Sequence, residues 1–260
     1  MSQENAKAAG QRFAWAGPTG SAWRRSDDPD AGKRRREHRH CALALATLSL
    51  RGPMESPPLS DAQNPPLQLF IIRHGETEWA LTGQHTGVSE IPLTAHGEDE
   101  ARALAPTFRE LAFTRVLVSP RQRARRTCEL AGLGAAAETE PNLAEWGYGD
   151  YEGLTPAEID QRRPGWEVFR DGCPGGESPE QASDRADRLL QSLRGLNGNV
   201  ALFTHGHFGR ALAVRWIDLP IATGGRFGLR TASIGILGYD PAHPDVPVIA
   251  LWNEVPSRRA

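Results

Sequence analysis

The chain has 260 residues, of which 39% are hydrophobic and 24% are charged, and its formal net charge is -2. This length allows one or two domains with a sizeable core, and no apolar run approaches the roughly 18 residues that a membrane span requires. The three cysteines, Cys41, Cys128 and Cys173, are odd in number and far apart, which argues against a disulfide framework and favours a reducing, cytoplasmic location.

Residues 1–66 differ in composition from the rest of the chain. Residues 1–53 hold ten Lys or Arg and five Asp or Glu, and a Pro- and Ser-rich stretch follows them. This composition, without hydrophobic periodicity, predicts a disordered N-terminal tail. A signal sequence is disfavoured because forty mostly polar residues precede the short apolar stretch 41–50. Met54 is an alternative start, so whether residues 1–53 are translated is left open.

From residue 67 to residue 260, apolar runs alternate with amphipathic segments. Strands are predicted at 67–72, 115–118, 135–140, 199–203, 231–239 and 246–252, and helices at 95–111, 121–132, 155–163, 179–196 and 206–217. This alternation predicts a single α/β domain, a three-layer sandwich with a mostly parallel central sheet and helices on both faces. The two adjacent strands at the end of the chain predict a partly antiparallel edge.

Three of the predicted strands end in turns with basic or histidine side chains. These stretches are FIIRHG with Arg73 and His74, VLVSPRQRA with Arg123, and ALFTHGHFG with His205. Ligands of open α/β sheets bind beyond the carboxyl ends of the strands, so the four side chains converge if the three strands are neighbours. Guanidinium groups and helix N-termini both favour phosphate oxygens. Each turn alone could equally be structural or solvated, but their shared position predicts a phosphate site.

The motifs RHGETEW, SPRQRARRT, LAEWGYGDYEG and THGHFGRA resemble the histidine phosphatase superfamily, which has the phosphoglycerate-mutase-like fold, over about residues 67–255. TEWALTGQHTG, FRDGCPGGES and TASIGILGY resemble its subgroup of acid phosphatases and sedoheptulose-1,7-bisphosphatases. The resemblance implies a metal-independent phosphomonoesterase that hydrolyses small phosphorylated metabolites, sugar bisphosphates among them, through a phosphohistidine intermediate.

The same resemblance implies a role for five catalytic residues. His74 would be the nucleophile, and Arg73, Arg123 and His205 would bind the transferred phosphoryl group. Glu145 would be the acid that protonates the leaving oxygen. The chemistry agrees, because cations near His74 would keep the imidazole neutral and would meet the phosphoryl charge without a metal ion. We therefore expect no cofactor and no metal.

Five further residues are expected to contact the substrate. Thr86 and Gly87 fall where the family places phosphate or substrate contacts, and Tyr148 falls at a substrate-contacting aromatic position. Gly206 permits close approach of the backbone. His207 could reach the substrate or pack in its turn, and both alternatives stay open.

The segment after Glu145 separates two candidate activities. Cofactor-dependent phosphoglycerate mutases of the family carry a longer basic insertion there, whereas residues 155–178 are short and have Arg162 and Arg163 as their only paired cations. This difference favours a phosphatase over a mutase. Asp150 or Glu152 could replace Glu145 as the acid, but we expect both to be structural or solvated.

A protein of another class, a non-catalytic module that binds a phospho-ligand or a protein, is the remaining alternative. The complete set of catalytic positions argues against it. A basic tail can indicate nucleic acid or a membrane surface, but we expect neither as a partner. The expected partner is the small phosphorylated substrate, and a homodimer is left open.

Overall fold

The computed structural model describes residues 65–256. The predicted N-terminal tail, except for its last two residues, lies outside the described residues. Met54, the alternative start, also lies outside them. Within the described range, no helix combines the length and the apolar character that crossing a membrane requires.

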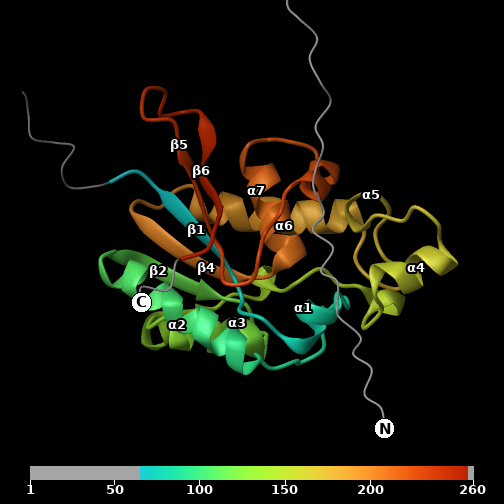
Figure 1. Cartoon of the computed structure of the whole chain (residues 1–260). Coiled ribbons are helices and arrows are strands. Elements are labelled where there is room, and N and C mark those ends of the chain that lie inside the picture. The colour runs from blue at the N-terminus through green and yellow to red at the C-terminus, as the bar shows by residue number, and fades with distance from the viewer. Residues whose placement is uncertain (1–64, 257–260) are drawn as a thin grey trace, which may run out of the picture. The chain divides into compact units, whose positions relative to one another are not determined.

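Residues 65–256 form a six-stranded sheet with the order β3-β2-β4-β1-β5-β6 (Figure 1). β1 to β4 run parallel, while β5 is antiparallel to β1 and β6 is antiparallel to β5. The predicted mixed sheet with an antiparallel edge is therefore confirmed. The strands are β1 (Gln68–Arg73), β2 (Phe113–Val118), β3 (Ala137–Thr139), β4 (Asn199–Thr204), β5 (Ile234–Tyr239) and β6 (Pro247–Glu254).

Helices cover both faces of the sheet, as expected for a three-layer sandwich (Figure 1). They are α1 (Glu78–Thr82), α2 (Ala95–Arg109), α3 (Gln122–Leu130), α4 (Pro156–Arg162), α5 (Val168–Asp171), α6 (Pro179–Leu193) and α7 (Gly206–Trp216).

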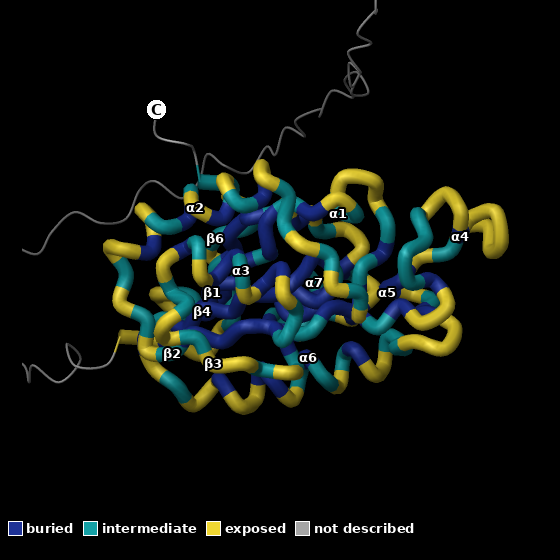
Figure 2. The backbone as a smooth tube through the Cα atoms, turned by 90° about the horizontal axis from the view of Figure 1, so that it is seen from below, coloured by how far each residue is buried: buried dark blue, intermediate teal, exposed yellow. Residues whose placement is uncertain are grey.

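Successive side chains of each central strand enter two different cores, because neighbouring residues of a strand point to opposite faces. In β1, Leu69 and Ile71 pack with residues of α6 and α7, whereas Phe70 and Ile72 pack with residues of α2 and α3. Each fully buried side chain of this size contributes about 1.5–3 kcal/mol. The buried strands lie between partly exposed helices (Figure 2), so the strand ends are held on a rigid scaffold.

The helices that the sequence predicted are present, with ends that local chemistry explains. Thr94 caps α2, because its hydroxyl accepts the Gly97 N–H, and Ser178 forms a capping box with Gln181 at the start of α6. The predicted helix 179–196 is three residues too long. After Leu193 the chain turns through Gly198, which has φ 78, to enter β4.

Two short helices, α1 and α5, were not predicted. They have five and four residues, and hydrophobic periodicity needs a longer window to indicate a helix. Thr77 caps α1, which ends at Gly83 with φ 79. α1 lies near the carboxyl ends of the parallel strands (Figure 1).

Candidate active site

The turns that follow β1, β2 and β4 lie next to one another, because these strands are parallel neighbours in the sheet. Arg73 ends β1 and His74 follows it, Arg123 lies in the first turn of α3, and His205 is the N-cap residue of α7. The rings of His74 and His205 are 5.2 Å apart between centroids. The strand order on which the predicted convergence depended is therefore present.

His74 is a neutral imidazole with a defined tautomer. Its Nδ1 lies 2.7 Å from the carbonyl oxygen of Gly75, and a carbonyl can only accept, so Nδ1 carries the proton. Burial, reinforced by Arg123 and then Arg73, holds the pKa of His74 well below its usual range. Nε2 consequently keeps its lone pair, so it is the atom that can act as a nucleophile.

His205 is fully buried and its Nε2 lies 2.7 Å from Oγ of Ser119. The same hydroxyl oxygen accepts the N–H of Arg121 at 3.3 Å. With the imidazole proton on Nδ1, the hydroxyl donates to Nε2, and Nδ1–H is left for an acceptor in the site. Burial, followed by Arg123 and His74, holds the pKa of His205 well below its usual range.

Backbone carbonyls tether the two arginines. Arg73 donates from Nη1 to the carbonyl of Leu229 at 2.6 Å. Arg123 donates to the carbonyls of Ser89 and Thr86 at 2.9 and 2.8 Å. Burial lowers the pKa of each guanidinium, and the charge of the Glu145 carboxylate opposes that effect.

Buried nitrogen donors without a hydrogen-bond partner gather around His74. Among the described residues they are Nε of Arg73, Nε of Arg123 and Nδ1 of His205; a fourth such atom, Nε of Arg121, belongs to a side chain that binds Val88 and Glu90 instead. A buried donor without an acceptor costs about 1–3 kcal/mol, so such atoms rarely gather by chance. An anion bound in front of His74 would supply the missing acceptors.

Glu145 caps helix α7 from a distant loop. Oε1 accepts the N–H groups of Trp146 and Phe208 at 2.9 and 2.8 Å, and Oε2 accepts the N–H of His207 at 3.1 Å. His205 makes no side-chain cap of its own, so the carboxylate satisfies first-turn donors that would otherwise be free. Oε2 has one bond fewer than Oε1 and therefore keeps a position for a proton.

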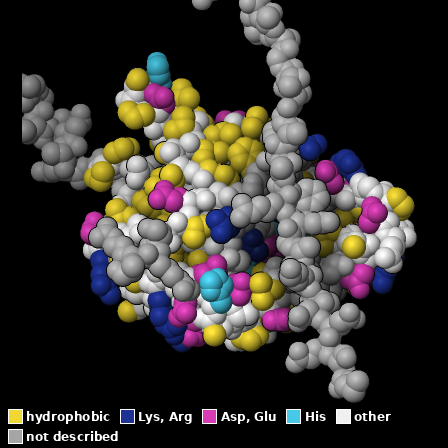
Figure 3. Space-filling model, viewed as in Figure 1, with side chains coloured by type: hydrophobic (Ala, Val, Ile, Leu, Met, Phe, Trp, Pro, Cys, Tyr) yellow, Lys and Arg dark blue, Asp and Glu magenta, His cyan; other side chains and the backbone are white. Residues whose placement is uncertain are grey.

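Arg73, His74 and Glu145 line a cavity of about 240 Å³, whereas Arg123 and His205 lie next to His74 but are not part of its lining. Basic side chains are set into a hollow near the middle of the face in Figure 3, and they are arginines because residues 65–256 contain no lysine. Within the described range, no group of three or more His, Cys, Asp or Glu side chains has an arrangement that could hold a metal ion. The cavity is lined by Arg73, His74, Thr77, Trp79, Ala80, Gly83, Gln84, His85, Thr86, Glu145, Tyr148, Pro156, Gly206, His207, Arg210 and Leu229.

Comparison with known protein families identifies the family to which this arrangement of side chains belongs. Residues 69–254 match the model of the histidine phosphatase superfamily, branch 1. The chain belongs to this superfamily. The membership confirms the family, the fold and the phosphatase class that the sequence predicted.

Relatives of this histidine phosphatase include two enzymes that are named for their activities. It is 43% identical over 188 residues to an acid phosphatase of Mycobacterium tuberculosis, covering 71% of this chain and 92% of the relative. It is 34% identical over 185 residues to a sedoheptulose 1,7-bisphosphatase of Saccharomyces cerevisiae, covering 58% of this chain and 68% of the relative. A solved Mycobacterium tuberculosis structure superposes with TM-score 0.65 at 41% identity, covering 72% of this chain and 98% of that one.

Most residues predicted to contact the substrate of the phosphatase line the cavity. Thr86, Tyr148, Gly206 and His207 belong to its wall, and their contacts with the substrate, including the choice between contact and packing for His207, stay predictions. Gly87 is not part of the lining, and its N–H is bound to the Glu152 carboxylate at 2.9 and 3.0 Å. Its role as a substrate contact stays a prediction.

Tyr148 sets the tautomer of His207. The hydroxyl lies 2.6 Å from Nδ1 of His207, and burial, followed by Glu145, raises the pKa of Tyr148 well above its usual range. Burial, followed by Arg210, holds the pKa of His207 well below its usual range. The neutral tyrosine therefore donates to Nδ1, and His207 carries its proton on Nε2.

The two other carboxylates of the Glu145 loop have the structural or solvated roles expected of them. Glu152 accepts the N–H groups of Gly87 and Ser89, so it fixes the loop over Arg123. Asp150 is exposed. Of the three carboxylates, Glu145 alone lines the cavity.

Three residues of the site were missed by sequence reasoning. Ser119, bonded to His205, follows β2 directly, and Arg210 lies one helical turn after Gly206 on the same face of α7, so both had a positional signal. His85 had none. It enters the cavity only because its backbone pairs with Leu154 and Gly153, far away in the sequence.

Proposed function

We propose that this histidine phosphatase hydrolyses small phosphorylated metabolites, sugar bisphosphates among them, through a phosphohistidine at His74 and without a metal ion. The observation that carries the proposal is the set of unpartnered donors of Arg73, Arg123 and His205 around a neutral imidazole. Such donors match the equatorial oxygens of a phosphoryl group in transfer.

The proposed reaction has two displacements. In the first, Nε2 of His74 attacks phosphorus, the ester P–O bond breaks, and Glu145 gives its proton to the leaving oxygen. In the second, water attacks the phosphohistidine, Glu145 takes a proton from that water, and the N–P bond returns its electron pair to Nε2. The two steps share one acid–base group, as microscopic reversibility requires.

The size and charge of the cavity support a small anionic substrate. At about 240 Å³ it falls just below the roughly 300–1,000 Å³ of sites for drug-sized ligands. Arg210 adds a cation to its wall, and its Nε and Nη1 are held by the carbonyls of Gly206 and Phe227. The relative named sedoheptulose 1,7-bisphosphatase points to the same substrate class.

A substrate screen tests the activity. Sugar phosphates, sugar bisphosphates and phosphoglycerates should release inorganic phosphate, with His74→Ala inactive and His243→Ala, which changes an exposed histidine, fully active. Isomerisation of phosphoglycerate without phosphate release would indicate a mutase. Binding of these compounds without turnover would indicate a non-catalytic module.

The phosphohistidine is tested by rapid quenching with a ³²P-labelled substrate. Acid-labile label should appear on the native protein and be absent from His74→Ala. Label that persists in this variant would move the nucleophile to another residue, with His205 the next candidate.

Metal independence is tested with chelators. The two arginines and His205 supply the positive charge and donors, so activity should survive excess EDTA. Activity that disappears under EDTA and returns with magnesium would contradict the proposal. The cytoplasmic location, the lack of nucleic-acid and membrane partners, and a homodimer stay predictions.

A further inference from the structure

The loop that carries Glu145 separates two cavities. Glu145 lines the cavity with His74 and also a second one of about 540 Å³, whose other lining residues include Glu177 and Arg185. Neither Glu177 nor Arg185 lines the cavity with His74. They therefore lie on the opposite side of the loop from the substrate.

We propose that the ion pair between Glu177 and Arg185 positions Glu145 for proton transfer. The pair fixes the backbone on both sides of Glu145 and the helix turn that binds its carboxyl group. The inference rests on the proposed function, in which Glu145 protonates the leaving oxygen.

The ion pair itself is bidentate and largely buried. Nε of Arg185 donates to Oε1 of Glu177 at 2.8 Å, and Nη2 donates to Oε2 at 2.7 Å. The two side chains are 13% and 15% exposed. A fork of two parallel charge-assisted bonds restricts both side chains to one geometry, as a positioning element requires.

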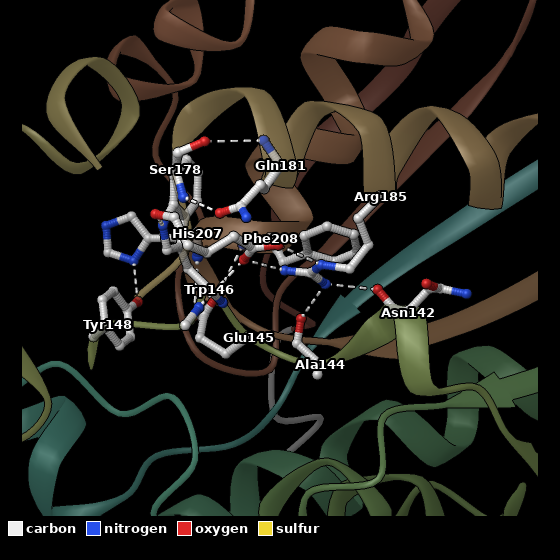
Figure 4. Close-up of polar contacts among 12 residues, drawn as sticks. Asn142, Ala144, Glu145, Trp146, Tyr148, Ser178, Gln181, Arg185, His207 and Phe208 are labelled. Atoms are coloured by element: carbon white, nitrogen blue, oxygen red, sulfur yellow. Dashed lines mark hydrogen bonds and ion pairs between the residues drawn. The ribbon is translucent and has the colours of Figure 1, made fainter. Parts of the chain in front are cut away.

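Arg185 holds the chain that leads into Glu145. Its Nη1 donates to the carbonyls of Asn142 and Ala144, both at 2.8 Å. Figure 4 shows the guanidinium reaching both carbonyls. The backbone immediately before Glu145 is thus fixed to helix α6.

Glu177 holds the chain that leaves Glu145. Its N–H donates to the carbonyl of Gly147 at 2.7 Å, its Oε2 accepts the Gly147 N–H at 3.3 Å, and its carbonyl accepts Nε1–H of Trp146 at 2.9 Å. The ion-paired side chains therefore bind Ala144 before the proposed acid and Gly147 after it, and the backbone of Glu177 binds Trp146.

The same guanidinium also contacts the helix that binds the carboxyl group. Cζ of Arg185 lies 3.6 Å from the centre of the Phe208 ring, and the N–H of Phe208 donates to Oε1 of Glu145. Figure 4 shows the guanidinium against this ring. Arg185 thus contacts the loop of the acid and the helix turn that orients it.

A purely stabilising ion pair is the competing interpretation. Replacing a buried pair by apolar residues is often neutral or stabilising, so stability alone is a weak reason for this one. The two interpretations differ in substrate dependence. An acid that is misplaced by a fraction of an ångström fails most with a poor leaving group, whereas lost stability affects all substrates alike.

The test uses Arg185→Lys and Glu177→Gln, with Glu145→Gln as the reference variant. We expect kcat/KM to fall by about tenfold or more for a sugar phosphate and by less than about threefold for an aryl phosphate. Combining Arg185→Lys with Glu145→Gln should add little further loss on the sugar phosphate, because both changes remove the same proton transfer.

Arg215→Lys is the matched control. Arg215 forms a bidentate pair with Asp187, both bonds at 2.8 Å, and donates to the carbonyl of Leu219. Like Arg185, it forms a bidentate pair with a carboxylate and binds a backbone carbonyl, but its pair joins α7 to α6, and its bonds to Asp187 and Leu219 do not reach the Glu145 loop. Its substitution should leave the ratio of kcat/KM between the two substrates within about twofold of the native value.

Exchange of indole protons gives a readout that does not depend on catalysis. In Arg185→Lys, the Trp146 Nε1–H should exchange faster by NMR, because its acceptor is the backbone carbonyl of Glu177, and the side chain of Glu177 loses its bidentate partner. The Trp216 Nε1–H, bonded to the carbonyl of Gly238, should be unaffected.

Two results would overturn the inference, and they are distinguishable. If Glu145→Gln shows the leaving-group dependence and Arg185→Lys shows equal losses on both substrates with unchanged Trp146 exchange, the positioning role fails and the proposed function stands. If Glu145→Gln itself slows both substrates equally, the acid role in the proposed function fails, and the positioning role fails with it.

Discussion

At the scale of single residues, the site is built from groups whose protonation is set by burial. His74 and His205 are neutral because burial and nearby guanidiniums disfavour the imidazolium form. The Gly75 carbonyl, which can only accept, assigns the proton of His74 to Nδ1, and the Ser119 hydroxyl pairs with Nε2 of His205. The residue types alone would permit other tautomers.

The lowered pKa of His74 predicts the acid limb of the pH profile. A free histidine gains its second ring proton at about pH 6.5. His74 should remain a neutral imidazole, with Nε2 free to attack, below that pH. We expect kcat/KM for an aryl phosphate to show no loss at pH 6.5 and to fall only at clearly lower pH. A profile that drops with an inflection near 6.5 would contradict the predicted neutral state.

At the scale of elements, the turn after β1 is fitted against the start of α2 by backbone contact. A Cβ on Gly75 would collide with the carbonyl of Gly97, and a Cβ on Gly97 would collide with the backbone of Glu76. The carbonyl of Glu76 also accepts the N–H of Thr94, the cap of α2. Helix and turn therefore hold His74 as one unit.

The substitution Gly97→Ala tests this contact. The added methyl group should push the His74 turn away, which costs about 1–3 kcal/mol of stability and about tenfold or more in kcat, since misplacement near 1 Å can cost about 100-fold. Gly195→Ala is the control, because no atom lies within 4 Å of its Cβ position. Thermal unfolding and steady-state kinetics measure both variants, and native-like kinetics in Gly97→Ala would contradict the prediction.

At the scale of the whole molecule, burial of several imidazoles couples catalysis to stability. Burial is the first cause of a lowered pKa in four histidines of the site, which are His74, His85, His205 and His207. The unfolded chain binds protons at these positions below about pH 6.5, whereas the folded chain does not. Proton binding therefore favours the unfolded state as the pH falls.

The free energy of unfolding should decrease as pH falls from about 6.5 toward the lower pKa values of the folded state. Each histidine contributes up to about 1.4 kcal/mol per pH unit in that window. Urea unfolding between pH 7.5 and 5 measures this slope, and His207→Gln should reduce it by one such contribution. Stability that is independent of pH in this window would contradict the prediction.

The sequence by itself determined the elements and the catalytic motifs. Apolar runs and helical periodicity are local properties, so the six strands and five longer helices follow from residues close together in the chain. The motifs around His74, Arg123, Glu145 and His205 were specific enough to indicate the family, which the comparison of residues 69–254 confirmed.

Only the tertiary structure decided which groups meet. The order β2-β4-β1 brings the three strand ends together, and the bond from Phe208 N–H to Glu145 joins residues 63 positions apart. His85 and Arg185 gain their roles from such distant contacts. Periodicity carries no information about them, because a hydrogen bond between distant segments depends on how packed elements fit and not on local sequence pattern.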